Sequence, residues 1–189
     1  MSETVRLPAT ADPQSSAAER IRVAFERNQK ALRLRPGVGR GTATTRVRVT
    51  EGLICDVEEG PWRLTVDMGD KHGGTGAGPN PGVLGRAALG SCLAIGYQTW
   101  AAHLGVPIEA LEVEVQADYD GGGTYATADV PAGYLQVRCA VTVTSPAPDA
   151  EVMRVLDEAD AHSSYRDVFA RAHDVRREVR LRRPGGGDG

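Results

Sequence analysis

The chain has 189 residues, of which 41% are hydrophobic and 25% charged, and this composition excludes a wholly disordered protein. A formal net charge of -3 argues against a dedicated nucleic-acid-binding protein, so we expect no nucleic-acid partner. No apolar run approaches the roughly 18 residues of a membrane span, and the polar N-terminus is unlike a secretory signal. We therefore expect a soluble, cytoplasmic protein of one domain, or one domain with tails, without a membrane partner.

The cysteines and histidines match no disulfide framework and no metal-site pattern. Cys55, Cys92 and Cys139 are too few and too widely spaced for a disulfide scaffold, and none belongs to a CxxC pair. The four histidines lack the HExxH and cysteine-linked spacings of zinc sites: His72, His103, His162 and His173. The common nucleotide-binding and hydrolase signatures are missing too, so we expect no metal and no cofactor. Cysteine chemistry, binding or scaffolding remain as functions.

The N-terminal 40 residues differ in character from the rest of the chain. Residues 1–15 are polar and predict a loose arm, and Ser16 begins a capping-box pattern for a helix over about residues 17–33. Between residues 17 and 48, nine Lys and Arg residues accompany two acidic ones. Such a basic helix could contact anionic lipid or nucleic acid, but a solvated face docked on its own protein or a partner subunit is the simpler interpretation. We assign residues 1–40 to this arm and basic helix.

Three short strands and a glycine-rich loop follow. Alternating apolar and polar residues predict strands between residues 42 and 67, and their close spacing implies an antiparallel meander. Cys55 lies in one of these strands and is interpreted as a small, half-buried hydrophobe. The segment Gly69–Gly78 contains five glycines and predicts a flexible linker that can also border a pocket.

The most informative segment runs from Pro79 to Gly105. Asn80 suits a helix N-cap, Pro81 suits the first helical position, and Gly105 suits a left-handed stop. Apolar residues on nearly every face are typical of a helix buried in a core. Small residues are also frequent, although each glycine costs up to about 1 kcal/mol relative to alanine, so we expect another backbone to approach closely. Cys92 lies in the middle of this small-residue stretch.

The C-terminal half predicts two long strands, two helices and a last strand. Cys139 shares a face with valines of the second long strand, where it is most simply core filling. The further elements expected are a helix opening at Pro148-Asp149, a short helix capped at Ser164 and ending near Ala172, and a strand over Val175–Leu181. Hairpin-linked strands preclude a doubly wound parallel sheet, so the fold class is α+β. We assign the main domain to residues 41–183 and a disordered tail to residues 184–189.

The string Ala87-Ala88-Leu89-Gly90-Ser91-Cys92-Leu93-Ala94, preceded by Pro79-Asn80-Pro81, resembles the central-helix segment of the OsmC/Ohr superfamily of organic hydroperoxide resistance proteins. The resemblance continues through Gly105-Val106-Pro107, Ser145-Pro146-Ala147 and Ala159–His162, and covers roughly residues 42–182. It implies an OsmC-like fold, with antiparallel sheets around a buried central helix. It also implies an intertwined homodimer with active sites at the subunit interface.

The resemblance implies a peroxidatic cysteine at Cys92 and a second cysteine that resolves the sulfenic acid. At the second position the family has His-Cys-Pro, whereas this chain has His162-Ser163-Ser164, and serine forms no disulfide. The family glutamate near the start of the central helix is Val83 here. Arg46 and Arg48 lie in the region of the activating arginine, but the motif assigns that role to neither.

These departures lead to three hypotheses. Burial raises the thiol pKa above about 8.5, and Cys92 lies too far along its helix for that helix's dipole to help, so activation needs a nearby cation such as His162. The first hypothesis is a single-cysteine peroxidase that reduces organic hydroperoxides and is regenerated by a thiol. The second is a non-catalytic dimer that binds an apolar small molecule, and the third is a dimeric scaffold whose basic helix contacts a partner.

Overall fold

The computed structural model describes residues 16–182, so the expected arm at residues 1–15 and tail at residues 184–189 lie outside the described part. The elements in chain order are α1 (Ala17–Leu34), η1 (Pro36–Gly39), β1 (Arg46–Glu51), β2 (Ile54–Glu59), β3 (Trp62–Val66), η2 (Asp70–His72), α2 (Pro81–Leu104), β4 (Ala110–Tyr119), α3 (Gly121–Thr124), β5 (Tyr134–Thr144), α4 (Asp149–Ala161) and α5 (Ser164–Ala170). This mixture of helices and antiparallel strands confirms the α+β class.

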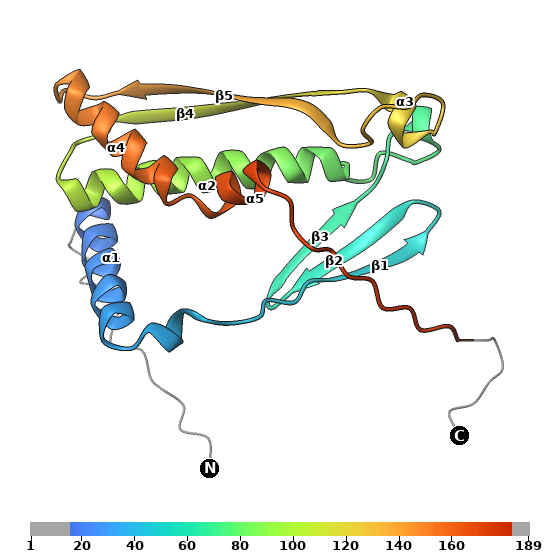
Figure 1. Cartoon of the computed structure of the whole chain (residues 1–189), viewed down its shortest axis with the longest axis horizontal. Helices are drawn as coiled ribbons and strands as arrows, with labels where there is room; N and C mark the ends of the chain where they lie inside the picture. The colour runs from blue at the N-terminus through green and yellow to red at the C-terminus, as the bar shows by residue number, and fades with distance from the viewer. Residues whose placement is uncertain (1–15, 183–189) are drawn as a thin grey trace, which may run out of the picture.

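Two antiparallel sheets lie on opposite sides of α2 (Figure 1). The first has the order β1-β2-β3 and is the predicted meander, while β4 and β5 form a long two-stranded ribbon. The ribbon runs along α2, whereas α4 and α5 cover another side of the helix and α1 stands against its C-terminal end. The central position of α2 follows from the apolar composition that the sequence predicts for it.

Helix α2 begins and ends where the sequence places its caps. The side chain of Asn80 accepts a hydrogen bond from the Val83 N–H at 3.1 Å, and Gly105 adopts the left-handed conformation with a φ of 72°. Leu89, Leu93 and Tyr97 are buried against Ala159 of α4 and against partly buried valines of the ribbon: Val113, Val115, Val137 and Val141. The core of the molecule is therefore assembled on one side of α2.

The small residues of α2 allow close approach, as predicted. A Cβ atom added at Gly90 would lie 3.1 Å from Val115 Cγ2, and one added at Gly96 would lie 3.8 Å from the Cβ of Ala159. The helix therefore accepts the propensity cost of glycine where β4 and α4 approach it.

One side of α2 is nevertheless exposed, so the single chain does not bury the helix on all its faces. The exposed residues follow one stripe at helical spacing: Val83, Ala87, Ser91 and Ile95. Ile95 is 66% exposed because no element within residues 16–182 covers this stripe. This apolar stripe bears on the assembly of the protein.

Three other expectations are also corrected. Cys139 is exposed rather than buried, because β5 is a free edge of a two-stranded ribbon. Residues 172–182 form no strand, because this stretch has no partner strand within residues 16–182. The cap of the last helix is Ser163 rather than Ser164, and its side chain accepts a hydrogen bond from the Arg166 N–H.

Helix α1 is docked on its own chain through an aromatic contact. The ring of Phe25 lies 5.2 Å from that of Trp100 and 4.5 Å from that of His103, measured between ring centroids. On α1 itself, the guanidinium of Arg22 pairs with the carboxylates of Glu19 and Glu26. The predicted basic helix is therefore present and packs against the end of α2.

The glycine-rich loop before α2 is organised by a buried carboxylate. Asp67 is 1% exposed and accepts hydrogen bonds from the Thr75 hydroxyl and from the backbone N–H groups of Met68, Thr75 and Ala77. The Thr75 hydroxyl is the largest influence, and together these donors outweigh burial and lower the pKa of Asp67 to about 2. This carboxylate fixes the path of the loop to the N-terminus of α2.

Candidate functional site

Cys92 lies on the half-buried side of α2 that faces α5. Its Sγ atom is 3.6 Å from the Oγ of Ser163 and 3.6 Å from the Oγ of Ser164. The two serines occupy the cap and the first residue of α5, and Ser163 is itself buried. The structure thus brings together three residues that the sequence singled out separately, and serines contact the sulfur where a second cysteine would be expected.

The N-terminal end of α5 supplies hydrogen-bond donors to this sulfur. The backbone N–H groups of Ser164 and Tyr165, at the start of this helix, lower the pKa of Cys92 in addition to the two hydroxyls. N–H groups in a first helical turn have no partner within their helix, so they are available to an anion. The Ser163 oxygen accepts from the Arg166 N–H at 3.3 Å, which leaves the hydroxyl hydrogen of Ser163 free to point at the sulfur.

These donors determine the acidity of the thiol. Burial raises the pKa of Cys92, but the bond from the Tyr165 N–H, the two serine hydroxyls and the Ser164 N–H together lower the pKa below its usual value. A lowered pKa increases the thiolate fraction at neutral pH, and the thiolate is the nucleophilic form. The sequence pointed to a cation for this role, whereas the groups that lower the pKa of Cys92 within residues 16–182 are neutral donors at the start of α5.

The charged residues considered for this role have other partners. The ring of His162 lies 5.0 Å from that of Trp100, and its Nδ1 is 2.8 Å from the carbonyl oxygen of Glu158. Arg48 pairs with Glu58 on β2. Within residues 16–182, the donors to the Cys92 sulfur are serine hydroxyls and backbone amides, and neither Arg46 nor Arg48 is among them.

The other cysteines have different surroundings. Cys55 is half-buried in β2, as predicted, and Cys139 lies on β5. Burial, with a smaller contribution from the Asp160 carboxylate, raises the pKa of Cys139. All three thiols are free. Cys92 therefore has the more acidic thiol of the two whose pKa is shifted.

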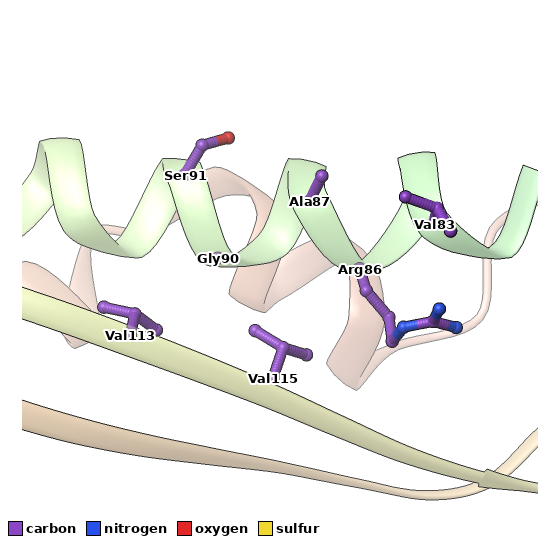
Figure 2. Close-up of a pocket in the computed structure, with 7 residues that line it drawn as sticks. All are labelled: Val83, Arg86, Ala87, Gly90, Ser91, Val113 and Val115. Carbon is purple, nitrogen blue, oxygen red and sulfur yellow. The ribbon is translucent and has the colours of Figure 1, made fainter. Parts of the chain in front are cut away.

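Two cavities lie along α2 toward its N-terminus. A groove of about 330 Å³ runs along α2 and β4 (Figure 2). It is lined by Val83, Arg86, Ala87, Gly90, Ser91, Val113 and Val115. A larger cavity of about 670 Å³ lies at the start of the helix, where its walls include Met68, His72, Arg86, Tyr119, Tyr125 and Tyr134. Met68 and His72 come from the region of the glycine-rich loop, which borders a pocket as the sequence suggested.

Neither a metal site nor a membrane span is found in the described part of the chain. Residues 16–182 bring together no group of three or more His, Cys, Asp or Glu side chains suited to hold a metal ion. No helix in this range is both long and apolar enough to cross a bilayer.

Comparison with protein families identifies the domain. Residues 73–178, more than half of the chain, match the family model described as OsmC-like protein. This chain belongs to the OsmC-like protein family. The match contains α2, the ribbon, α4 and α5, and therefore includes both Cys92 and the serines that contact it. The resemblance deduced from the sequence is confirmed.

Solved structures agree on the fold. An OsmC like protein from Mycoplasma pneumoniae is 16% identical, with a TM-score of 0.60 over 69% of this chain and 88% of that one. An organic hydroperoxide resistance protein OsmC from Legionella pneumophila is 17% identical, with a TM-score of 0.52 over 68% and 89% of the two chains. At these identities the similarity establishes an OsmC-like fold. Among curated proteins, none matches the sequence significantly.

We predict that Ser164→Ala lowers the reactivity of Cys92. The variant removes one hydroxyl that bonds to the thiolate and leaves the Ser163 cap intact, so the pKa of Cys92 rises. Because hydrogen bonds to charged groups contribute about 1.5–3 kcal/mol at most sites and less to sulfur, alkylation of Cys92 by iodoacetamide at pH 7 should slow by about threefold to tenfold. Its pH profile should also move to higher pH.

The matched control is Ser91→Ala, because the Ser91 hydroxyl bonds to the Ala88 carbonyl rather than to the sulfur. Mass spectrometry of the Cys92 peptide gives the rate for this thiol alone. Equal rates and equal pH profiles for the wild type and Ser164→Ala would refute the role of the hydroxyl.

Proposed function

We propose that this protein is a single-cysteine thiol peroxidase that reduces organic hydroperoxides through a sulfenic acid at Cys92, in oxidative-stress defence. The observation that carries the proposal is the set of donors from Ser163, Ser164 and Tyr165 that lowers the pKa of Cys92. An acidic, half-buried thiol at the core of the family domain is the form of cysteine that peroxides oxidise. The Legionella neighbour is itself an organic hydroperoxide resistance protein, which agrees with this choice of substrate.

The chemistry follows from the residues around the sulfur. The Cys92 thiolate attacks one oxygen of the hydroperoxide, the O–O bond breaks, and the departing alkoxide takes up a proton and leaves as an alcohol. The sulfur is thereby oxidised to a sulfenic acid. Serine hydroxyls and amides that stabilise the thiolate can also bond to the sulfenate oxygen, because they donate hydrogen bonds to whichever anion occupies the site.

The return to the thiol requires an external reductant. Ser163 and Ser164 contact the sulfur but form no disulfide, so a thiol from solution condenses with the sulfenic acid and releases water. A second thiol then breaks the mixed disulfide and frees Cys92. Two thiols are oxidised for each hydroperoxide, and a supply of reduced thiols is consistent with a cytoplasmic location.

The experiment is to measure hydroperoxide consumption by the purified protein with a small thiol as reductant. We expect turnover of cumene hydroperoxide by the wild type and a fall to the buffer rate in Cys92→Ser. A dimedone-type reagent should label Cys92 in the presence of peroxide. The double variant Cys55→Ser, Cys139→Ser is the matched control and should retain activity, because neither thiol has donors like those at Cys92.

A different result would reject the enzyme. If Cys92 stays reduced under peroxide while Cys55 and Cys139 are oxidised no more slowly than Cys92, the chain is no peroxidase. The second hypothesis, binding of an apolar small molecule, would then be favoured. The cavity of about 670 Å³ lined by Tyr119, Tyr125 and Tyr134 has the size and the aromatic walls for such a ligand.

We further propose that the protein works as a homodimer. The single chain leaves two apolar surfaces uncovered. One is the stripe on α2 from Val83 to Ile95, where Ile95 is 66% exposed, and the other is the three-stranded sheet, where Trp62 is 74% exposed. A second copy can cover both surfaces, because a symmetric interface buries the same patch on each subunit.

We predict that Ile95→Glu converts the dimer to a monomer. A carboxylate at position 95, the last residue of the α2 stripe, would have to be buried in the dimer without a partner, which costs several kcal/mol per subunit. Light scattering coupled to size-exclusion chromatography should give the dimer mass for the wild type and the monomer mass for the variant. Met153→Glu, an exposed position on α4 outside the stripe, is the control and should remain dimeric. A monomeric wild type at micromolar concentration would contradict the proposal.

A further inference from the structure

One hydrogen bond and one ion pair connect α5 to α2 through Asp160. The Tyr97 hydroxyl donates to Oδ1 of Asp160 at 2.8 Å, and Oδ2 of Asp160 lies 3.8 Å from Nε of Arg166. Tyr97 is on α2 five residues after Cys92, Asp160 is next to the end of α4, and Arg166 is on α5 two residues after Ser164. The link therefore spans the helix that carries the thiol and the two helices that meet above it.

Tyr97 is a buried, protonated donor, and Asp160 helps to hold the turn between α4 and α5. Tyr97 is 3% exposed and belongs to the core of the domain. Burial raises the pKa of its phenol and the bond to Asp160 raises it further, so Tyr97 stays protonated and donates throughout the neutral range. The backbone of Asp160 also holds the α4–α5 turn, because its carbonyl oxygen accepts from the Ser163 N–H at 3.4 Å.

Helix α5 needs such an anchor because it is short. It has seven residues, none of them buried, which is too short for a helix to be stable by itself. At its far end the ring of Phe169 stacks on Tyr134 with centroids 6.5 Å apart. Hydrogen bonds weaken steeply when donor and acceptor move out of line, so the start of α5 must be held in place for its donors to reach Cys92.

We propose that Tyr97 and Asp160 are positioning residues for Cys92: the bond between them fixes the α4–α5 turn and so places the donors of Ser163, Ser164 and Tyr165 on the sulfur. The inference deepens the proposed function, because it names residues that act on the same thiol through other residues. It does not require that the protein reduce peroxides, because it concerns only the reactivity of the thiol.

The charge of Asp160 allows positioning to be separated from electrostatics. A carboxylate disfavours a nearby thiolate, and Asp160 adds to the effect of burial in raising the pKa of Cys139. If Asp160 acted on Cys92 only through its charge, its removal would make Cys92 more reactive. If it acts by positioning, removal of the side chain makes Cys92 less reactive.

The test is the pH profile of Cys92 alkylation by iodoacetamide, followed on the Cys92 peptide by mass spectrometry. Tyr97→Phe changes no charge and removes one hydroxyl, and we expect the rate at pH 7 to fall by about threefold to tenfold. Asp160→Ala should cause a similar fall. Asp160→Asn keeps an acceptor for Tyr97 and should restore the rate to at least the wild-type value.

Tyr134→Phe is the matched control, because the Tyr134 hydroxyl also bonds to α2, at the Gly82 carbonyl, but has no bond to the α4–α5 turn. It should leave the profile unchanged. Thermal unfolding establishes that each variant is folded. If Asp160→Ala does not fold, the conservative variants Tyr97→Phe and Asp160→Asn test the positioning role.

The proposal is overturned if folded Tyr97→Phe has the wild-type profile, or if Asp160→Asn is as slow as Asp160→Ala. Both results are independent of peroxidase activity, since iodoacetamide needs only the thiolate. Failure of the wild type to consume hydroperoxide would reject the proposed function and leave this result standing.

Discussion

The acidity of the Cys92 thiol depends on the contact between its sulfur and the first turn of α5. A half-buried thiol in an apolar helix would ordinarily have a raised pKa and little thiolate. Here the hydroxyls of Ser163 and Ser164 and the backbone amides of Ser164 and Tyr165 outweigh burial and lower the pKa of Cys92. The donors are neutral, so the site favours an anion without burying a cation near the thiol.

The same contact explains the construction of α2. The helix has to carry Cys92 in a packed environment and also admit β4 and α4 at short range, and the glycines at positions 90 and 96 satisfy both needs. Tyr97 lies one and a half turns beyond Cys92 and bonds to the turn that presents the donors. Tyr97 is thus a core residue that also orients the residues in contact with the sulfur.

Much of the fold was predictable from local signals. Asn80, Pro81 and Gly105 define α2 to the residue, and the alternation of apolar residues defines the strands of both sheets. These features are encoded by neighbours in the sequence, which is why one sequence suffices to find them. The exposed stripe on α2 and the unpaired segment 172–182 were not predictable in this way, because apolar composition indicates burial but not whether the same chain provides the cover.

The chemistry of the site was less accessible to sequence reasoning. Cys92 was identified through the family motif, but the sequence pointed to a nearby cation such as His162 for its activation. The donors come instead from residues 163–165, about 70 positions away, and two of them are backbone amides that carry no sequence signal. The sequence placed the cap of this helix at Ser164 rather than Ser163. The proximity of Ser163 to Cys92 depends on the packing of α4 and α5 against α2.

The central claim is that the wild-type Cys92 thiol is more acidic than an ordinary cysteine because of the N-terminal end of α5. The direct measurement is a pH titration of the thiolate ultraviolet absorbance in the double variant Cys55→Ser, Cys139→Ser, so that Cys92 is the thiol observed. We predict a midpoint clearly below that of the same protein unfolded in urea. A midpoint equal to or above the unfolded value would contradict it, because burial would then outweigh the donors of α5.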